Sequence, residues 1–295
     1  MNYLVVALPN DSNLAEWLGK KGGSNGVTFY NRREGECVLT ILAPSDLEGK
    51  FYALGETLTI ADVAVISTRE VNSDFGEAAI AAALLKKKVL LTKDNDVSAI
   101  IGKLGMDYEL VDKEDILGKL SDMAAKKEHK AELSVTIDKA FPVKGVGVVL
   151  LGIVTAGEVK AHDKLKLSSG KELQVRSIQV QDEDRDSAGE GARVGLAVKD
   201  ADERDVEKGE LLAREQVKSV TEISAQLSFS PMGSEFSEET QYTLVNRFSV
   251  APCKISRDGS SYKIRLGKPA QMRKGDAFIV LRDKKPRVLC AGTTI

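Results

Sequence analysis

The sequence is poor in histidine and cysteine. Its 295 residues include two histidines and three cysteines, and no two cysteines have the short spacing of a zinc-binding pair. Zinc sites and histidine-based triads need several such side chains, so we expect no metal site and no triad. Three widely separated cysteines also argue against a disulfide framework. A reducing, cytoplasmic compartment is therefore the prediction.

Long apolar runs are also lacking. The sequence contains no stretch of ~20 apolar residues, so we expect no membrane-spanning helix and no membrane partner. The first ten residues are a short apolar run that ends at Pro9. They have neither a basic segment nor a small-residue cleavage site, and we interpret them as a buried strand and not as a signal peptide.

The chain as a whole has almost no net charge, but its last part is strongly basic. The net charge is −2, which argues against a dedicated DNA-binding protein. From Lys254 onward, however, eleven Lys and Arg residues stand against three Asp residues. A basic end on an acidic body is typical of a surface that faces RNA or another polyanion, and a solvated sheet face would explain it equally well.

Apolar runs alternate with helical patterns over the first 125 residues. A short helical pattern with Leu14, Trp17 and Leu18 on one face follows the first run. The predicted strands lie at 3–8, 37–42, 60–66, 88–91 and 108–111, and the predicted helical segments at 47–58, 77–85, 97–104 and 113–123. This alternation is typical of βαβ units and indicates a mainly parallel sheet.

The pattern changes after a linker at 124–130. Short β-branched runs separated by Gly, Asp and Lys turns follow, and no long helical pattern remains. Such runs are typical of small closed barrels. We therefore predict an α/β domain at 1–125 followed by two all-β domains, one barrel at 131–215 and a second barrel at 217–295.

Several motifs in the all-β part resemble those of the Tu-type translation elongation factors, above all the selenocysteine-specific branch. They are IDKAFPVKGVG at 137–147, GIVTAGEVK at 152–160, DKL at 163–165, VRSIQ at 175–179, GARVGLA at 191–197, KPAQMRKGD at 268–276 and AGTT at 291–294. The resemblance covers 131–295 strongly and 1–123 weakly. It implies a GTPase-like α/β domain followed by the family's two β-barrels.

The resemblance also implies a pocket for the aminoacyl end of a tRNA in the first barrel. Asp138 matches the family's pocket acid, Lys139 stands where the family has a basic residue, often Arg, and Arg193 matches a second pocket Arg. A carboxylate beside two cations suits the charged parts of an aminoacylated RNA end. The alternative is an ordinary salt bridge on the rim of a barrel, which stabilises little.

The first domain departs from the GTPase motifs that the resemblance leads one to expect. A phosphate-binding loop ends in Gly-Lys-Ser/Thr, where the backbone and the Lys hold phosphates and the hydroxyl holds Mg²⁺. At the matching positions stand Asn13, Leu14 and Ala15. Leucine cannot neutralise phosphate charge, so the loop is predicted to be degenerate.

Two further motifs are changed in the same way. Leu42 stands at the position of the Mg²⁺-linked Asp, and the base-reading Asn-Lys-x-Asp becomes Thr92, Lys93, Asp94 and Asn95. Lys93 survives, but an amide replaces the carboxylate that reads guanine. We therefore expect a GTPase-like fold that is not an enzyme and takes neither GTP nor Mg²⁺ as a cofactor.

Three functions remain open at this point. The first is an elongation-factor-like protein that binds tRNA, aminoacyl-tRNA or another RNA and engages the translation machinery; its phosphate contacts would be Arg273, Lys274, Lys284, Lys285 and Arg287. The second is a protein-interaction module that docks a translation factor or self-associates. The third is a residual GTP-binding switch with unusual loops. The oligomeric state is left open.

Overall fold

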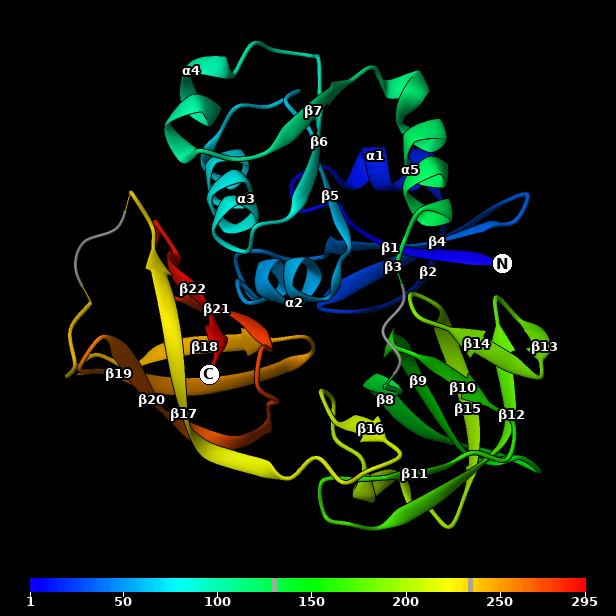
Figure 1. Cartoon of the computed structure of the whole chain (residues 1–295). Helices are drawn as coiled ribbons and strands as arrows, with labels where there is room; N and C mark the ends of the chain where they lie inside the picture. Colours follow the sequence, from blue (N-terminus) through cyan, green and yellow to red (C-terminus); the bar gives the residue numbers. More distant parts are fainter. Residues whose placement is uncertain (129–131, 233–235) are drawn as a thin grey trace.

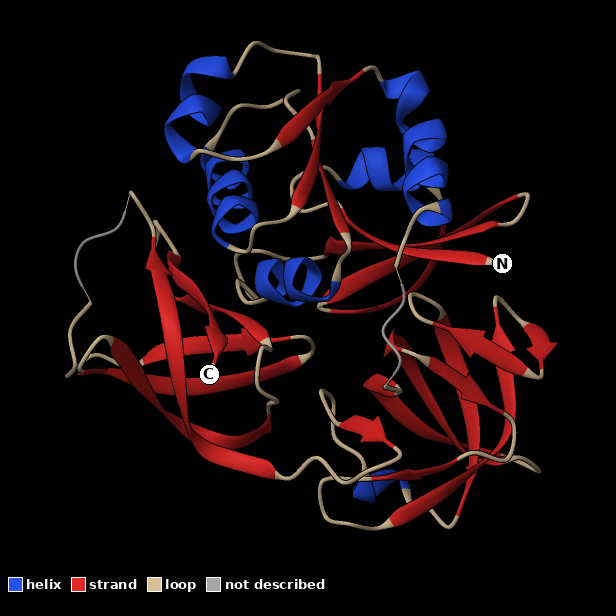
Figure 2. Ribbon diagram, viewed as in Figure 1, coloured by secondary structure: helices blue, strands red, loops and turns tan. Residues whose placement is uncertain are grey.

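Figure 1 shows three domains arranged as a triangle, with the N-terminal α/β domain at the top and the two β domains below it. The computed structural model describes residues 1–128, 132–232 and 236–295. The last two residues of the predicted linker 124–130 lie outside these ranges. An α/β domain followed by two β domains confirms the predicted fold class (Figure 2).

The first domain is a seven-stranded sheet with helices on both faces. Its strands are β1 (Asn2–Ala7), β2 (Lys20–Asn25), β3 (Val27–Glu34), β4 (Cys37–Pro44), β5 (Val63–Ile66), β6 (Lys88–Thr92) and β7 (Tyr108–Val111). Its helices are α1 (Ser12–Leu18), α2 (Ala53–Ile60), α3 (Ser73–Leu84), α4 (Ser98–Ile101) and α5 (Ile116–Ala125), with short 3-10 turns η1 (Gly102–Leu104) and η2 (Lys113–Asp115).

The strand order is β2-β3-β4-β1-β5-β6-β7. The strands from β4 to β7 in this order are parallel. Strand β1 lies at the centre of the whole sheet, paired with β4 from Asn2↔Cys37 to Ala7↔Leu42 and with β5. Both faces of β1 are covered, since α2 and α3 pack on one side and α1 and α5 on the other. Continuous apolar runs such as that of β1 are typical of such doubly covered strands.

The antiparallel hairpin β2–β3 was not predicted from the sequence. The hairpin follows α1 directly, and only Gly19 lies between the helix and β2. All six residues of β2 are exposed, so the strand lacks the apolar alternation that marks a half-buried one. Trp17 also differs from expectation: its side chain is 39% exposed, with the Lys113 ammonium 4.9 Å from its ring, and does not join Leu14 and Leu18 in the core.

The second domain is a barrel closed by the pairing of β11 with β12. Its sheet order is β11-β16-β8-β9-β15-β12-β13, and a small pair, β10–β14, lies beside it. The strands are β8 (Ser134–Val143), β9 (Gly147–Ala156), β10 (Glu158–Lys160), β11 (Lys164–Lys166), β12 (Glu172–Val180), β13 (Glu183–Arg185), β14 (Ser187–Gly189), β15 (Arg193–Lys199) and β16 (Leu211–Ala213), with a 3-10 turn η3 (Glu203–Asp205) before the last.

The third domain is a closed six-stranded barrel of order β17-β20-β19-β18-β21-β22. Its strands are β17 (Ser219–Phe229), β18 (Tyr242–Asn246), β19 (Ser249–Asp258), β20 (Ser261–Gln271), β21 (Ala277–Leu281) and β22 (Val288–Thr294). Closure pairs every strand on both sides and so leaves no free sheet edge.

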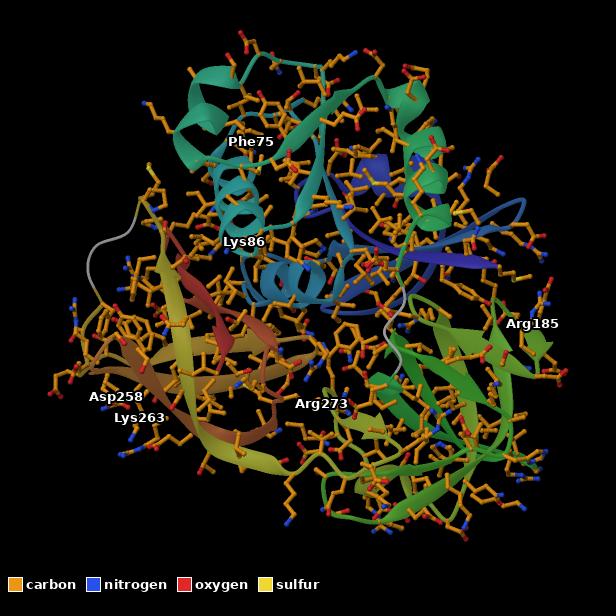
Figure 3. All side chains as sticks on the ribbon, in the orientation of Figure 1. Phe75, Lys86, Arg185, Asp258, Lys263 and Arg273 are labelled. Atoms are coloured by element: carbon orange, nitrogen blue, oxygen red, sulfur yellow. The ribbon has the colours of Figure 1, made fainter. Side chains whose placement is uncertain are left out.

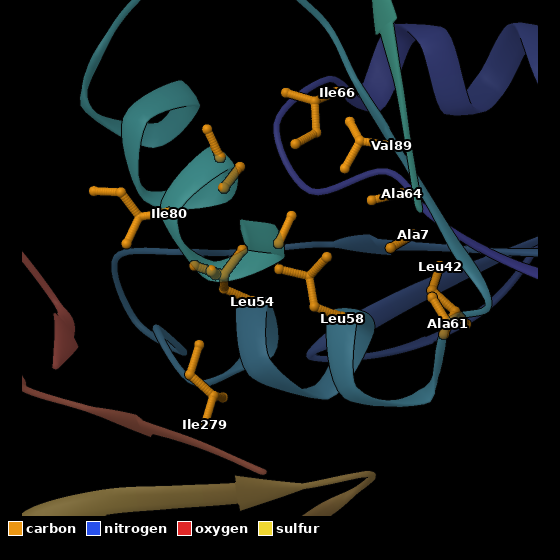
Figure 4. Packing of buried hydrophobic residues seen from close by; sticks show 14 of the residues in the cluster. Ala7, Leu42, Leu54, Leu58, Ala61, Ala64, Ile66, Ile80, Val89 and Ile279 are labelled. Carbon is orange, nitrogen blue, oxygen red and sulfur yellow. The ribbon is translucent and has the colours of Figure 1, made fainter. Parts of the chain in front are cut away.

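The hydrophobic core crosses the boundary between the first and third domains. Val245, Phe248 and Ile279 of the third domain belong to the same buried cluster as Leu54 and Leu58 of α2. Figure 4 shows Ile279 facing the helix from the side opposite the sheet. A Cβ atom added at Gly55 would lie 2.8 Å from Ile279 and 2.9 Å from Val245, so the glycine permits this close approach.

The first and second domains also make direct contact. Tyr3 and Val38 of the first domain belong to the buried cluster of the second barrel. Thr40 donates a hydrogen bond of 3.1 Å to the carbonyl of Gly191. Gly191 has a positive φ of 98°, and a Cβ atom there would lie 2.9 Å from the carbonyl oxygen of Tyr3. In the described ranges, the helices are too short or too polar to cross a bilayer.

Candidate functional site

The first candidate site lies at the carboxyl ends of the parallel strands β1, β5 and β6. Open α/β sheets bind their ligands at this edge, where the strand order reverses. The structure has a small cavity of about 170 Å³ here. It is lined by Asp11, Asn13, Leu14, Ser67, Arg69, Thr92, Asp94 and Lys113. Ligand pockets for drug-sized molecules usually measure ~300–1,000 Å³.

The turn from β1 into α1 is closed by its own side chains. Asp11 is the residue before the helix, and its carboxylate accepts a hydrogen bond of 2.9 Å from the backbone N–H of Leu14. Asn10 bridges to the end of β5, donating to the Ser67 carbonyl at 2.7 Å and accepting from the Ser67 N–H at 3.1 Å. The backbone donor that would meet an anion at a helix start therefore already has a carboxylate partner.

Two of the three positions predicted to replace the phosphate-binding residues point into the core. Leu14 and Ala15 are buried between α1 and the sheet, while Asn13 lines the small cavity. Leu42, in place of the Mg²⁺-linked Asp, is buried among the side chains of α2 and α3. In the described ranges, no group of three or more His, Cys, Asp or Glu side chains is placed to hold a metal ion.

The segment predicted to replace the base-reading motif joins two loops. The Thr92 hydroxyl accepts from the Thr68 N–H at 2.8 Å, and the Asn95 amide donates to the Thr68 carbonyl at 2.8 Å. Lys93 pairs with Asp112 after β7. These contacts lie at the predicted edge of the sheet, and the loss of guanine-nucleotide binding there stays a prediction.

The second candidate site contains Asp138 and Arg193, which the structure brings together. Arg193 Nη2 lies 3.0 Å from Asp138 Oδ2, and both side chains are largely buried. Asp138 lies at a bulge in β8, where the register with β9 shifts, so that it and Ile137 are both buried. The Arg193 guanidinium also stacks on Phe29 of the first domain, 3.2 Å from the ring centroid.

Lys139 is not part of this pair. Its side chain is exposed, and its ammonium lies 5.7 Å from the Phe141 ring. Asp138 and Arg193 thus meet beneath the first domain, while Lys139 faces elsewhere. A role of these three residues in holding an aminoacyl end stays a prediction.

A buried carboxylate beside this pair was not found by sequence reasoning. Glu56 of α2 is 0% exposed, and its Oε1 lies 2.7 Å from Lys208 Nζ of the second domain. Burial raises the pKa of Glu56 to about 7, the Lys208 charge opposes this rise, and the negative charge of Asp138 adds to it. No motif or periodicity marks Glu56 or Lys208, since their proximity arises from domain packing.

Two of the predicted RNA phosphate contacts lie at a domain interface, and the prediction for Arg287 needs correction. Arg287 is 6% exposed, and it binds Glu77 of α3 through its backbone N–H at 2.7 Å and its guanidinium at 3.1 Å. Lys285 lies 2.7 Å from Ser73 Oγ and 2.8 Å from Asp74 Oδ1 at the start of α3. Both side chains join the third domain to the first. Arg287 is buried there and not presented to a phosphate, whereas Lys285 is half-exposed and its contact with RNA stays a prediction.

The other three predicted contacts are placed differently. Lys274 and Lys284 are exposed. Arg273 is half-buried, with its Nη2 3.4 Å from Glu132 Oε1, and Figure 3 shows it between the two barrels. Their binding to RNA stays a prediction.

Sequence comparisons relate the second domain to a known family. Residues 147–213 match the family described as Elongation factor Tu domain 2. An uncharacterized protein of Methanocaldococcus jannaschii is 26% identical over 288 residues, 93% of this chain and 94% of its own length. The selenocysteine-specific elongation factor of the same organism is 28% identical over 180 residues, but these are 59% of this chain and 38% of that protein.

Solved structures share the fold of the whole chain. A bacterial selenocysteine-specific elongation factor, EF-Sec, superposes with a TM-score of 0.80 at 20% identity and covers 100% of this chain and 58% of that one. The translation elongation factor SelB of Methanococcus maripaludis, solved with the GTP analogue GPPNHP, gives 0.77 at 19% identity, covering 99% and 78%. The chain is therefore elongation-factor-like, with the fold of selenocysteine-specific elongation factors, and its match to the jannaschii factor spans about two fifths of that factor's length.

Proposed function

We propose that this elongation-factor-like chain binds RNA through its β-barrels and that its first domain neither binds nor hydrolyses GTP. The absence of GTP binding is argued from the Asp11 carboxylate, which lies at the start of α1, 2.9 Å from the N–H of Leu14. A phosphate would need this end of the helix, and it would meet a negative charge there.

The neighbouring positions support the same proposal. Phosphoryl transfer relies on a lysine and a metal ion to neutralise the phosphates. At the matching positions Leu14 and Leu42 are packed in the core. The small volume of the cavity at this edge agrees, because a nucleoside triphosphate would need Asn10 and Asp11 to release their present partners.

The RNA half of the proposal is supported by kinship and charge. The second domain matches a family named for elongation factor Tu, and relatives include factors named as selenocysteine-specific. The third domain carries the basic excess of the chain, with Lys274 and Lys284 exposed on it. Exposed cations on a barrel are suited to the sequence-independent phosphate contacts that dominate RNA affinity.

The nucleotide half is tested by calorimetric titration with GTP and GDP in the presence of Mg²⁺, together with a hydrolysis assay. The Methanococcus maripaludis factor, which was solved with a GTP analogue, serves as the positive control. We expect no heat of binding and no turnover from this chain. Micromolar binding would overturn the assignment and favour a residual nucleotide switch.

The RNA half is tested by filter binding of charged and uncharged tRNA over a range of salt concentrations. Lys274→Gln and Lys284→Gln should each weaken binding and lower the slope of log affinity against log salt by about 1. Lys103→Gln, an exposed lysine of the first domain, is the matched control. Absence of affinity at low salt, with a salt-insensitive protein complex instead, would favour the interaction module.

A further inference from the structure

A large cavity lined by described residues lies where the three domains meet, away from the carboxyl-end edge of the first sheet. Its volume is about 880 Å³. The first domain contributes the end of α2 and the turn between α3 and β6, the second contributes Ser134 and Thr155, and the third contributes Asn246, Arg247 and the turn 273–277. Figure 3 shows Lys86 in the first domain, at the end of α3, and Arg273 between the two barrels.

Polar atoms without a hydrogen-bond partner gather in the wall of this cavity. Among the described residues, eight buried side-chain atoms lack a partner with hydrogen-bond geometry, and three of them belong to cavity residues: Asn246 Oδ1, Arg247 Nε and Arg273 Nη2, the last of which lies 3.4 Å from Glu132 Oε1. The Asn246 side chain is 1% exposed. Buried polar atoms are nearly always paired, so the unpaired Arg247 donor and Asn246 acceptor in one cavity indicate a missing partner.

These three side chains are held in place by their other atoms. The Asn246 amide donates to the Ala277 carbonyl at 2.7 Å. Arg247 donates to the Gln271 carbonyl at 3.0 Å and pairs with Asp276 at 3.0 Å. The Arg247 backbone has a positive φ of 54°, unusual for a residue with a side chain, and its N–H donates to Thr59 of α2 at 2.9 Å.

The charge of the cavity wall is positive. Its lining includes six cations and four carboxylates: Lys86, Lys87, Lys88, Arg247, Arg273 and Lys274 against Asp62, Glu132, Glu190 and Asp276. Lys127 lies 2.8 Å from Asp62 and 3.6 Å from Glu190, which adds a further cation beside two of the carboxylates. The cavity therefore favours an anionic occupant.

We propose that this cavity binds a small phosphate-bearing molecule. Guanidinium N–H groups suit phosphate oxygens, and here Arg247 Nε and Arg273 Nη2 would donate to them, with the lysines supplying charge. Asn246 Oδ1 would accept from a hydroxyl of the ligand, either the protonated oxygen of the phosphate or a neighbouring alcohol. The site is separate from the degenerate nucleotide edge and does not depend on the proposed RNA binding.

The unpaired oxygen of Asn246 predicts a preference between two anions of equal charge. At neutral pH hydrogen phosphate still carries one O–H, whereas sulfate of the same charge carries none. Asn246 Oδ1 can accept from the first but not from the second. We expect titration calorimetry to give one site per chain for phosphate and a markedly weaker one for sulfate.

The location is tested with Arg273→Gln and with Arg265→Gln, a matched control that removes the same charge from an exposed part of the same barrel. Arg273→Gln should weaken phosphate binding about tenfold or more, because it removes a charge-assisted donor. The control should bind as the wild type does. Arg247→Gln also disturbs Asp276, so Arg273→Gln is the decisive variant, with its melting temperature checked alongside.

Three results would overturn the proposal. The first is no binding of phosphate at about 10 mM, a concentration that detects even weak millimolar affinity. The second is phosphate binding that Arg273→Gln leaves unchanged, which would place the ion elsewhere. The third is displacement of phosphate by a short RNA that carries hydroxyl ends, which would assign the cavity to a nucleic-acid backbone and not to a small molecule.

Discussion

The guanidinium of Arg193 stacks on the ring of Phe29, so the ion pair of the second domain is covered by a strand of the first. The residues implied as an aminoacyl pocket are thereby part of a domain interface. Removal of Arg193 would leave the Asp138 carboxylate buried without a cationic partner.

Arg193→Met should destabilise the protein by about 3–5 kcal/mol, the range seen when one partner of a buried ion pair is removed. The double variant Arg193→Met, Asp138→Leu should regain much of this loss, since it removes both charges. Urea unfolding measures both. Equal loss in the single and double variants would mean that packing on Phe29, and not the unpaired carboxylate, dominates.

Glu56 should make stability depend on pH. Its pKa is raised from 4.5 to about 7 by burial, so the folded protein retains a proton that the unfolded chain releases between these values. The free energy of unfolding should therefore fall as pH rises from 4.5 to 7, by on the order of 3 kcal/mol, and level off above.

Glu56→Gln serves as the reference for this pH dependence, because other groups titrate in the same window. Subtracting its profile from that of the wild type should leave the fall assigned to Glu56. Lys208→Met should make the fall larger, since the Lys208 charge opposes the rise in pKa. Identical profiles for wild type and Glu56→Gln, measured by denaturant unfolding at several pH values, would contradict the prediction.

The contacts of Arg287 and Lys285 with α3 should differ in strength. Arg287→Ala leaves Glu77 buried without its guanidinium partner and should cost about 3–5 kcal/mol. Lys285→Ala breaks a half-exposed contact with Asp74 and should cost at most about 1 kcal/mol. Chemical denaturation compares the two; similar losses would show that the Glu77 carboxylate finds another partner.

Gly55 should be intolerant of a side chain, although it lies within a helix. Alanine normally stabilises a helix by about 1 kcal/mol over glycine. At Gly55 the added Cβ would lie 2.8 Å from Ile279, so Gly55→Ala should destabilise instead. At Gly76 of α3 nothing lies within 4 Å of the added Cβ, and Gly76→Ala should raise the melting temperature.

The order of elements in the first domain was predictable because β1, β4 and β6 are apolar runs between polar turns. Continuous apolar runs of this kind are typical of parallel strands that are buried on both faces. Strand β2 escaped prediction because Lys20, Lys21 and its glycines bury nothing.

The site residues were predictable where a local motif marks them. Asp138 and Arg193 came from the resemblance of the second domain, and the structure joins them. Arg287 was expected to face solvent because its surroundings in the sequence are basic, but Glu77 lies 210 residues away and turns it inward. Such pairs, like Glu56 with Lys208, depend on how the domains pack, which periodicity does not encode.

The buried cluster that runs from α2 into β18 and β21 has a thermodynamic consequence. Domains linked only by tethers melt separately, each with its own enthalpy, whereas a shared core makes the loss of one domain expose the apolar face of the other. Heating should therefore produce a single endotherm whose calorimetric and van't Hoff enthalpies agree for at least the first and third domains together. A ligand held by either of these domains would then raise the melting temperature of both.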